Sequence, residues 1–173
     1  MTRRNILIFY VFIFVFFLSC SFIKPLELSA TLQKADKIVV LKSKRLLLLV
    51  QEGEIVKAYR VSLGKKPVGQ KTCAGDKKTP EGIYTIDSRN ADSKFHKALH
   101  ISYPNESDLL NAHKKGVPPG GDIMIHGLPN HKTDIGALHR SFDWTDGCIA
   151  VTNSEIEEIW QLVSDGTPIE IKP

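Results

Sequence analysis

The chain has 173 residues, of which 42% are hydrophobic and 24% are charged, and its formal net charge at pH 7 is +4. This length and apolar content favour one globular domain with a sizeable core and exclude a disordered or fibrous chain. The charge is spread along the chain without a run of five or more like charges, so we expect no nucleic-acid partner.

The first thirty residues have the pattern of an export signal. Arg3 and Arg4 precede an apolar run at residues 6–18. A basic start followed by roughly 7–15 apolar residues is typical of a secretory signal peptide. A helix of this length covers roughly 20 Å, which is short of a hydrocarbon core of about 30 Å. We expect residues 1–30 to be a signal peptide or an N-terminal membrane or lipid anchor, and the protein to be exported to the periplasm or cell envelope.

The processing of this leader has three open alternatives. Cys20 follows Phe-Leu-Ser, which loosely resembles a bacterial lipoprotein processing site. Cleavage after Ala30 is a second alternative. In the third, an uncleaved helix extends to Ile23 and anchors the chain in the membrane.

After the leader, short apolar runs separated by turn residues predict a mainly β domain. Residues 37–41, 45–50 and 55–62 indicate three strands, and Glu52-Gly53 is a hairpin turn between the second and the third. Further strands are expected at residues 83–87, 98–102, 123–127, 148–151 and 167–171. Many short strands with few helices predict a β-sandwich or barrel-like domain.

One amphipathic helix is predicted in the C-terminal half. Thr152 and Glu155 have capping-box spacing, and the apolar residues that follow recur on one helical face until a stop near Gly166. A short accessory helix is expected at residues 107–113, inside a loop at 103–122. A loop of that length in a small domain is often functional.

The segment Ile-Met-Ile-His-Gly, residues 123–127, is the first candidate for chemistry. Alternation along a strand places Ile123 and Ile125 on one face and Met124 and His126 on the other. A lone histidine on a strand is more often a core residue whose imidazole bonds a backbone carbonyl. A catalytic role for His126 is better supported than for a lone histidine, because a cysteine lies at the start of a second short apolar strand further along the chain.

That cysteine is Cys148, in a Thr-Asp-Gly-Cys turn ahead of the apolar run 149–151. If the two short strands pair, an imidazole and a thiol come within reach, and histidine can activate the thiol as a nucleophile. Gly147 allows close approach of a substrate, and backbone N–H groups around it can hold an oxyanion. This arrangement suits acyl transfer from an amide. The alternative is a buried structural thiol.

Other uses of the same residue types are less well supported. A disulfide between Cys73 and Cys148 is open for an exported protein. His96, His100 and His113 are zinc-ligand candidates together with Asp122 or Asp134, but no His-Glu-x-x-His motif and no Cys-x-x-Cys occurs, so we expect no metal. We expect His131 and His139 to be solvated or to line the cleft, and Trp144 to pack or to shape the cleft rim.

The paired motifs IMIHG, residues 123–127, and TDGCIAVTN, residues 145–153, resemble the catalytic core of the L,D-transpeptidases of bacterial cell walls, the YkuD-type domain. The similarity extends over residues 36–172 and includes TPEGIYTID at 79–87. It implies a YkuD-like catalytic domain at residues 36–173.

Matched motif by motif, the resemblance implies a role for five residues. Cys148 lies at the family's nucleophile and His126 at its proton donor and acceptor. Thr145 occupies a supporting Ser/Thr position and Gly147 the glycine of the oxyanion region. The carbonyl of Gly127 is a candidate for orienting the imidazole.

The implied reaction is peptidoglycan crosslinking or anchoring through a thioester. Stem peptides are the expected partner, a wall-anchored protein is a further acyl acceptor, and no cofactor is needed. Ala150 stands where many members have an arginine. The choice between transfer of the acyl group to an amine and its hydrolysis by water therefore stays open. The two rivals are a cysteine hydrolase of the same fold, which cuts peptide or protein–peptidoglycan links, and a non-catalytic wall-binding module.

Charged residues near the motifs lead to two further expectations. A carboxylate beside a thiol raises its pKa, so Asp143 and Asp146 are expected to turn away from Cys148. The lysines of the loop 64–80 are expected to be solvated, with attraction to carboxylate-rich stem peptides as the alternative: Lys65, Lys66, Lys71, Lys77 and Lys78.

Overall fold

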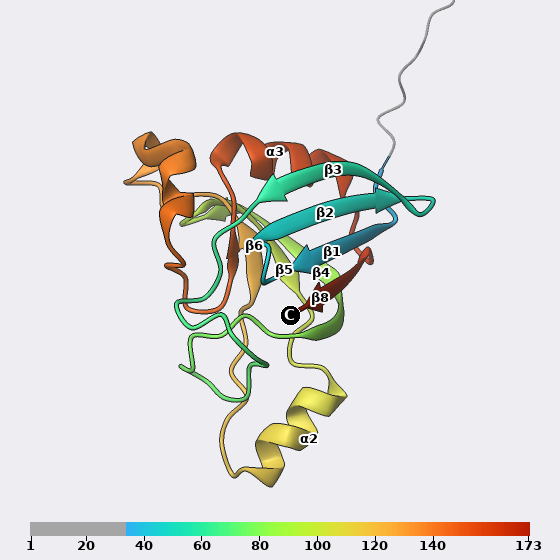
Figure 1. Cartoon of the computed structure of the whole chain (residues 1–173), viewed down its shortest axis with the longest axis vertical. Helices are drawn as coiled ribbons and strands as arrows, with labels where there is room; N and C mark the ends of the chain where they lie inside the picture. The colour runs from blue at the N-terminus through green and yellow to red at the C-terminus, as the bar shows by residue number, and fades with distance from the viewer. Residues whose placement is uncertain (1–33) are drawn as a thin grey trace, which may run out of the picture. The chain divides into compact units, whose positions relative to one another are not determined.

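A computed structural model describes residues 34–173, and Figure 1 shows their arrangement. The predictions for residues 1–30 lie outside the described residues. Within residues 34–173, no helix is long and apolar enough to cross a membrane.

The described chain forms one eight-stranded sheet with helices at its periphery. The strands are β1 Lys37–Leu41, β2 Leu46–Gln51, β3 Glu54–Arg60, β4 Gly82–Ser93, β5 His96–Ile101, β6 Met124–His126, β7 Ile149–Ala150 and β8 Pro168–Lys172. The helices are α2 Glu106–Lys114, the 3-10 segment η1 Thr133–Ser141 and α3 Asn153–Leu162. The mainly β fold class predicted from the sequence is confirmed.

The sheet nearly closes on itself. Its strand order is β3-β2-β1-β8-β4-β5-β6-β7, with parallel pairing between β1 and β8 and between β6 and β7. Beyond the end of β3, the N–H of Ser62 donates to Ala150 O at 3.0 Å, and the N–H of Ala150 donates to Ser62 O at 2.8 Å. The segment after β3 therefore pairs with β7, the other end of the sheet, which makes the domain barrel-like.

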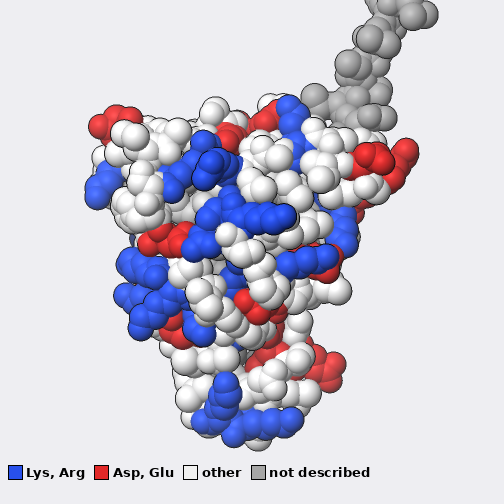
Figure 2. All heavy atoms as spheres, in the orientation of Figure 1, with Lys and Arg blue, Asp and Glu red and all other residues white. Residues whose placement is uncertain are grey.

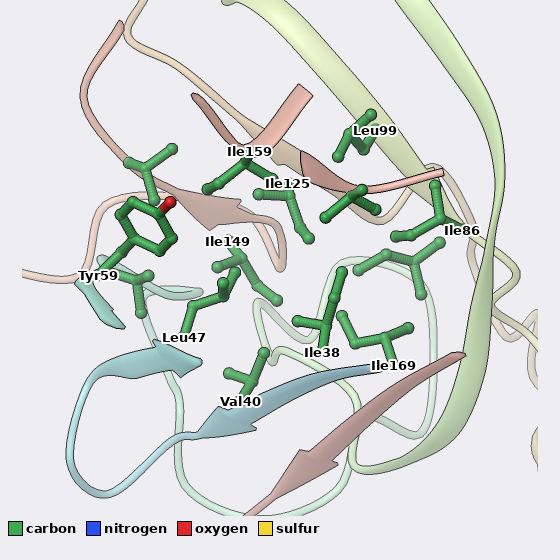
Figure 3. Close-up of a cluster of buried hydrophobic side chains, with 14 of the residues drawn as sticks. Ile38, Val40, Leu47, Tyr59, Ile86, Leu99, Ile125, Ile149, Ile159 and Ile169 are labelled. Carbon is green, nitrogen blue, oxygen red and sulfur yellow. The ribbon is translucent and has the colours of Figure 1, made fainter. Parts of the chain in front are cut away.

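The core lies between the inward faces of the strands and α3 (Figure 3). In β1 and β2 every second residue is buried, as the period of a pleated strand requires, and Ile38, Val40, Leu47 and Leu49 are inaccessible to solvent. Ile159 of α3 packs into the same cluster. Burying apolar side chains contributes roughly 25 cal/mol per Å², so this continuous cluster is the main source of stability.

The two α-helices begin as their sequences predict. In α3, Thr152 and Glu155 form the capping box, and the helix ends at Leu162, before the expected stop at Gly166. In α2, Asn105 and Asp108 form a second capping box, which satisfies N–H groups that lack partners in the first turn.

Two elements differ from the sequence-based expectation. β4 is 12 residues long and continues through the polar residues 88–93, where no strand was predicted. The hairpin with β5 explains the extension. Arg89 and Asn90 are paired with residues of β5, although this polar stretch has no alternation of apolar and polar residues that would predict a strand. η1 was not predicted either. It is kinked at Gly136, and tertiary contacts rather than helical periodicity hold it in place.

Candidate active site

The parallel pairing of β6 and β7 brings the two predicted motifs together. Ile125 is paired with Ile149, and His126 with Ala150. Ile125 and Ile149 are fully buried and point into the core (Figure 3). His126 therefore lies on the opposite face, beside Ala150. Cys148 directly precedes β7, and from the same alternation we infer that its side chain shares this face with His126.

His126 is held by its own chain. Its Nδ1 donates to Gly127 O at 2.7 Å, and a carbonyl can only accept, so Nδ1 carries a proton. Burial lowers the pKa of His126 to about 4, against the opposing effect of the Gly127 hydrogen bond, so the imidazole is neutral at pH 7. In the neutral ring the other nitrogen, Nε2, is therefore an acceptor.

Cys148 is a free thiol, partly exposed, and so is Cys73. The Sγ of Cys148 donates to Asp122 O at 3.5 Å. Burial raises the pKa of the thiol. The carboxylates of Asp122 and Asp146 act in the same direction, whereas the N–H of Met124 and the charge of Lys71 oppose them. The thiol is thus neutral at rest, and in the described residues no hydrogen bond joins it to His126.

The turn before Cys148 is fixed by Thr145. Its hydroxyl donates to Cys148 O at 2.7 Å and accepts from the N–H of Gly147 at 3.1 Å. Gly147 has φ +137, and a Cβ there would lie 2.9 Å from Lys78 O and 3.0 Å from Ile123 Cδ1. Only glycine fits this position, because a side chain would collide with the backbone of the neighbouring loop.

The two carboxylates near the turn point to different partners. Asp143 accepts hydrogen bonds from Arg45 and from the N–H of Leu63, so it anchors the turn to the β1–β2 connection and to the segment after β3. Asp146 is exposed and pairs with Lys65 at 3.1 Å. Asp143 turns away from the thiol as expected, whereas Asp146 still contributes to the raised pKa of Cys148.

An aromatic cluster covers His126. Its ring lies 4.4 Å from Phe95 and 5.7 Å from Trp144, measured between ring centroids, and Trp144 lies 6.4 Å from His139. Behind it, a cavity of about 170 Å³ is lined by six residues: Pro129, Lys132, Ile135, His139, Phe142 and Trp144. Trp144 thus lies beside the imidazole of His126 and also lines this cavity. His139 is 1% exposed, so of the two alternatives expected for it, solvated or lining the cleft, solvation is wrong.

Comparison with known proteins identifies the fold and the family. The model of the YkuD L,D-transpeptidase catalytic domain matches residues 35–171, which is most of the chain. The chain belongs to the L,D-transpeptidase family. The matched segment contains every residue of the site described above.

Relatives of the L,D-transpeptidase domain include YafK of Escherichia coli K12, which is 32% identical over 133 residues. That alignment covers 73% of this chain and 46% of YafK, so the chain spans about half the length of its curated relative. The helical cell shape determining protein Pgp2 of Campylobacter jejuni has a similar fold, with a TM-score of 0.60 and 23% identity over 78% of this chain and 46% of Pgp2. Bd1075 of Bdellovibrio bacteriovorus gives a TM-score of 0.53 and 26% identity over 82% of this chain and 51% of Bd1075.

Two buried lysines stabilise the loop between β3 and β4 of this L,D-transpeptidase domain, Lys42 from outside the loop and Lys71 from within it. Lys42, after β1, donates to Gly69 O, Thr79 O and Glu81 Oε1 at 2.8 to 2.9 Å. Lys71 is 4% exposed, so the expectation that all five lysines of this loop are solvated is wrong for Lys71. Basic side chains do gather on the side of the molecule where the loop runs, with single acidic side chains among them (Figure 2).

The remaining histidines lie in other surroundings. The imidazole of His96 pairs with Glu157 and that of His100 with Asp87. Among residues 34–173, no group of three or more histidine, cysteine or carboxylate side chains is placed to hold a metal ion.

Two contributors to the site were missed in the sequence. Asp122 acts through its backbone carbonyl, which no side-chain motif can reveal. Lys71 is a charged residue in a polar loop, and the only feature of the sequence that could have indicated a buried ion pair is Asp76, five residues further on.

Proposed function

We propose that this chain is a peptidoglycan L,D-transpeptidase with Cys148 as nucleophile and His126 as proton acceptor and donor. The observation that carries the proposal is the register of β6 and β7, in which His126 is paired with Ala150, two residues after Cys148. Side-chain alternation then supports a common face for the thiol and the imidazole. Membership of the family supports the reaction class.

The reaction proceeds through a thioester. The sulfur of Cys148 attacks the carbonyl carbon at the L-centre of a diamino acid that is bonded to a terminal D-amino acid. The C–N bond breaks, and His126 passes the thiol proton to the departing amine. A second amine then attacks the thioester, and its proton returns through His126 to the sulfur. The net result is a new amide bond.

The protonation states define how this reaction starts. The pKa of Cys148 is raised and that of His126 is lowered, so the pair rests as neutral thiol and neutral imidazole. The free Nε2 of His126 is the acceptor that the thiol proton requires. Rotation of the Cys148 side chain away from Asp122 O directs Sγ–H to this nitrogen, and the proton leaves as the sulfur attacks.

The oxyanion of the tetrahedral intermediate requires N–H donors. The N–H of Gly147 already donates to Thr145, and no acceptor within residues 34–173 takes the N–H of Cys148. We therefore assign the oxyanion contact to the N–H of Cys148, with Gly147 and Thr145 holding the turn that presents it. Donors fixed before the reaction stabilise the transition state because they need no reorganisation.

The place of action follows from substrate and leader together. Peptidoglycan stem peptides lie in the cell envelope, and residues 1–30 have the pattern of an export signal. We propose the periplasm or cell envelope as the location, with an attachment to the membrane if the leader is retained or lipidated. A wall-anchored protein that offers an amine is a further acyl acceptor.

Incubation of the purified protein with a disaccharide-tetrapeptide tests the proposal. Mass spectrometry should detect an acyl group on Cys148 and a crosslinked dimer as product. Cys148→Ala should abolish both, whereas Cys73→Ala, the matched control on the other described thiol, should retain both.

The other outcomes separate the rivals. A shortened monomer without dimer contradicts transfer and assigns the same acyl-enzyme to hydrolysis. Turnover that survives Cys148→Ala contradicts Cys148 as the nucleophile. Neither turnover nor an adduct on any cysteine of the wild type leaves a non-catalytic wall-binding module.

A further inference from the structure

Lys71 lies in a buried position that the mechanism above does not use. Its Nζ donates to Asp76 Oδ1 at 2.8 Å and to Cys73 O at 3.0 Å. The side chain is 3% exposed, and that of Asp76 is 11% exposed. An ion pair with this little exposure costs desolvation energy, and it contributes less to stability than an apolar pair of the same volume. The fold therefore retains a charge here at some cost.

Asp76 organises the loop around this lysine. Its carboxylate accepts hydrogen bonds from the N–H groups of Thr72, Cys73 and Lys78, at 2.7, 3.2 and 3.1 Å. With Lys71 as a further partner, the pKa of Asp76 is held below its usual value although burial opposes this, so the carboxylate is charged. The residues from Lys71 to Lys78 thus form a rigid loop with the ammonium inside it.

The same loop supports the segment that contacts the thiol. The N–H of Ala74 donates to Pro118 O at 2.8 Å, and a Cβ at Gly120 would lie 3.5 Å from Lys71 Cε. The ammonium lies 5.9 Å from the ring centroid of Tyr103, whose hydroxyl donates to Pro119 O at 2.9 Å. Asp122, which accepts the hydrogen bond of Cys148 Sγ, is two residues beyond Gly120.

Lys71 is also the cation whose charge reaches the sulfur. The groups that act on Cys148 from the surrounding elements are the carboxylates of Asp122 and Asp146, the N–H of Met124 and the ammonium of Lys71. His126, on the neighbouring strand β6, is neutral. Lys71 is the positive charge among these groups, and it opposes the two carboxylates with an effect smaller than that of either.

We propose that Lys71 is a positioning residue for Cys148: from inside the 71–78 loop, it holds the 118–122 segment under the thiol and supplies the positive charge that favours the thiolate. Asp76 holds Lys71 in place and partly cancels its charge. The proposal rests on the proposed function for its relevance to catalysis, but its effect on the thiol can be measured without substrate.

The test is the pH dependence of Cys148 alkylation by iodoacetamide, followed by peptide mass spectrometry so that other cysteines do not contribute. Lys71→Met should raise the midpoint by about one pH unit and slow alkylation at pH 7 about tenfold, because a smaller fraction of the thiol is ionised. Lys71→Arg should stay near the wild-type midpoint. Lys66→Met, at an exposed lysine of the same loop, is the matched control and should leave the midpoint unchanged.

Asp76→Asn distinguishes an electrostatic role from a purely structural one. It leaves the ammonium uncompensated, so the midpoint should fall, opposite to the effect of Lys71→Met. Shifts in the same direction for the two variants, or no shift in Asp76→Asn, would overturn the proposal. If Lys71→Met does not fold, the direction of the Asp76→Asn shift decides alone.

The two proposals fail separately. Opposite shifts with no acyl transfer from muropeptide would retain the role of Lys71 and reject the transpeptidase. Acyl transfer together with an unshifted alkylation midpoint in Asp76→Asn would retain the transpeptidase and reject the role of Lys71.

Discussion

His126 on β6 and His139 in η1 are two buried histidines whose rings both lie near Trp144, at 5.7 and 6.4 Å between centroids. His126 is 3% exposed and His139 is 1% exposed, and burial lowers the pKa of each to about 4. Both rings are therefore neutral at pH 7. By burial and charge alone, the two residues are nearly equivalent.

They differ in the partner of Nδ1. The Nδ1 of His126 donates to the carbonyl of Gly127, which leaves Nε2 as an acceptor. The Nδ1 of His139 has two neighbours instead of one: Ser62 Oγ at 3.2 Å and Nε1 of Trp144 at 3.5 Å. The indole can only donate, whereas Ser62 Oγ already donates its proton to His139 O, so these two neighbours favour opposite tautomers. The Nε2 of His139 is buried and has no hydrogen-bond partner in the described part of the chain. A single carbonyl thus fixes the tautomer of His126, and no single neighbour does so for His139.

The largest expected effect comes from exchanging each histidine for glutamine. His126→Gln should reduce acyl transfer roughly 10²- to 10⁴-fold, the usual contribution of a general acid and base. His139→Gln should change it less than threefold, because in the described residues no hydrogen bond joins His139 to Cys148 and its Nδ1 contacts Ser62 and Trp144 instead. Turnover of the disaccharide-tetrapeptide, measured by chromatography, makes the comparison. Equal losses in the two variants would contradict the assignment of the proton transfer to His126 alone.

In the pH dependence of stability, by contrast, the two histidines should behave alike. Each folded pKa is about 4, below the unfolded value of about 6.5, so the unfolded state binds more protons between these values. The free energy of unfolding therefore falls as pH decreases through this window. Each histidine should contribute about 2 kcal/mol of loss between pH 7.5 and pH 5.

Urea denaturation of the wild type and of the two glutamine variants at both pH values measures this loss. Each variant should show a smaller loss than the wild type, and by a similar amount. A variant with the wild-type loss would show that its histidine does not titrate in this range.

Ser62 gives the smallest expected effect. Its hydroxyl donates to His139 O at 2.9 Å and lies 3.2 Å from His139 Nδ1, in a buried position. Ser62→Ala should lower the free energy of unfolding by about 1 kcal/mol, the usual net contribution of such a bond, and change acyl transfer less than threefold. Thermal denaturation and turnover measure the two quantities. A large loss of turnover at full stability would assign the His139 side of Trp144 to the reaction.

Sequence patterns were sufficient where one local rule dominates. The Glu52-Gly53 turn, the Thr152–Glu155 capping box and the alternation in β1 and β2 all predicted their elements. They failed where pairing between distant residues overrides a weak local preference. No strand was predicted for residues 88–93, yet pairing with β5 extends β4 through them. η1 has no helical periodicity and depends on Ser62 and Glu155 for its position.

The sequence by itself determined the family, the mainly β fold and the two short strands that present His126 and Cys148, because spacing and side-chain alternation are encoded locally. Only the tertiary structure decided the β6–β7 register, the tautomer of His126, the carbonyl of Asp122 at the thiol and the burial of Lys71. These depend on which atoms of distant segments come within about 3 Å of one another, and a linear pattern of residue types does not contain that information.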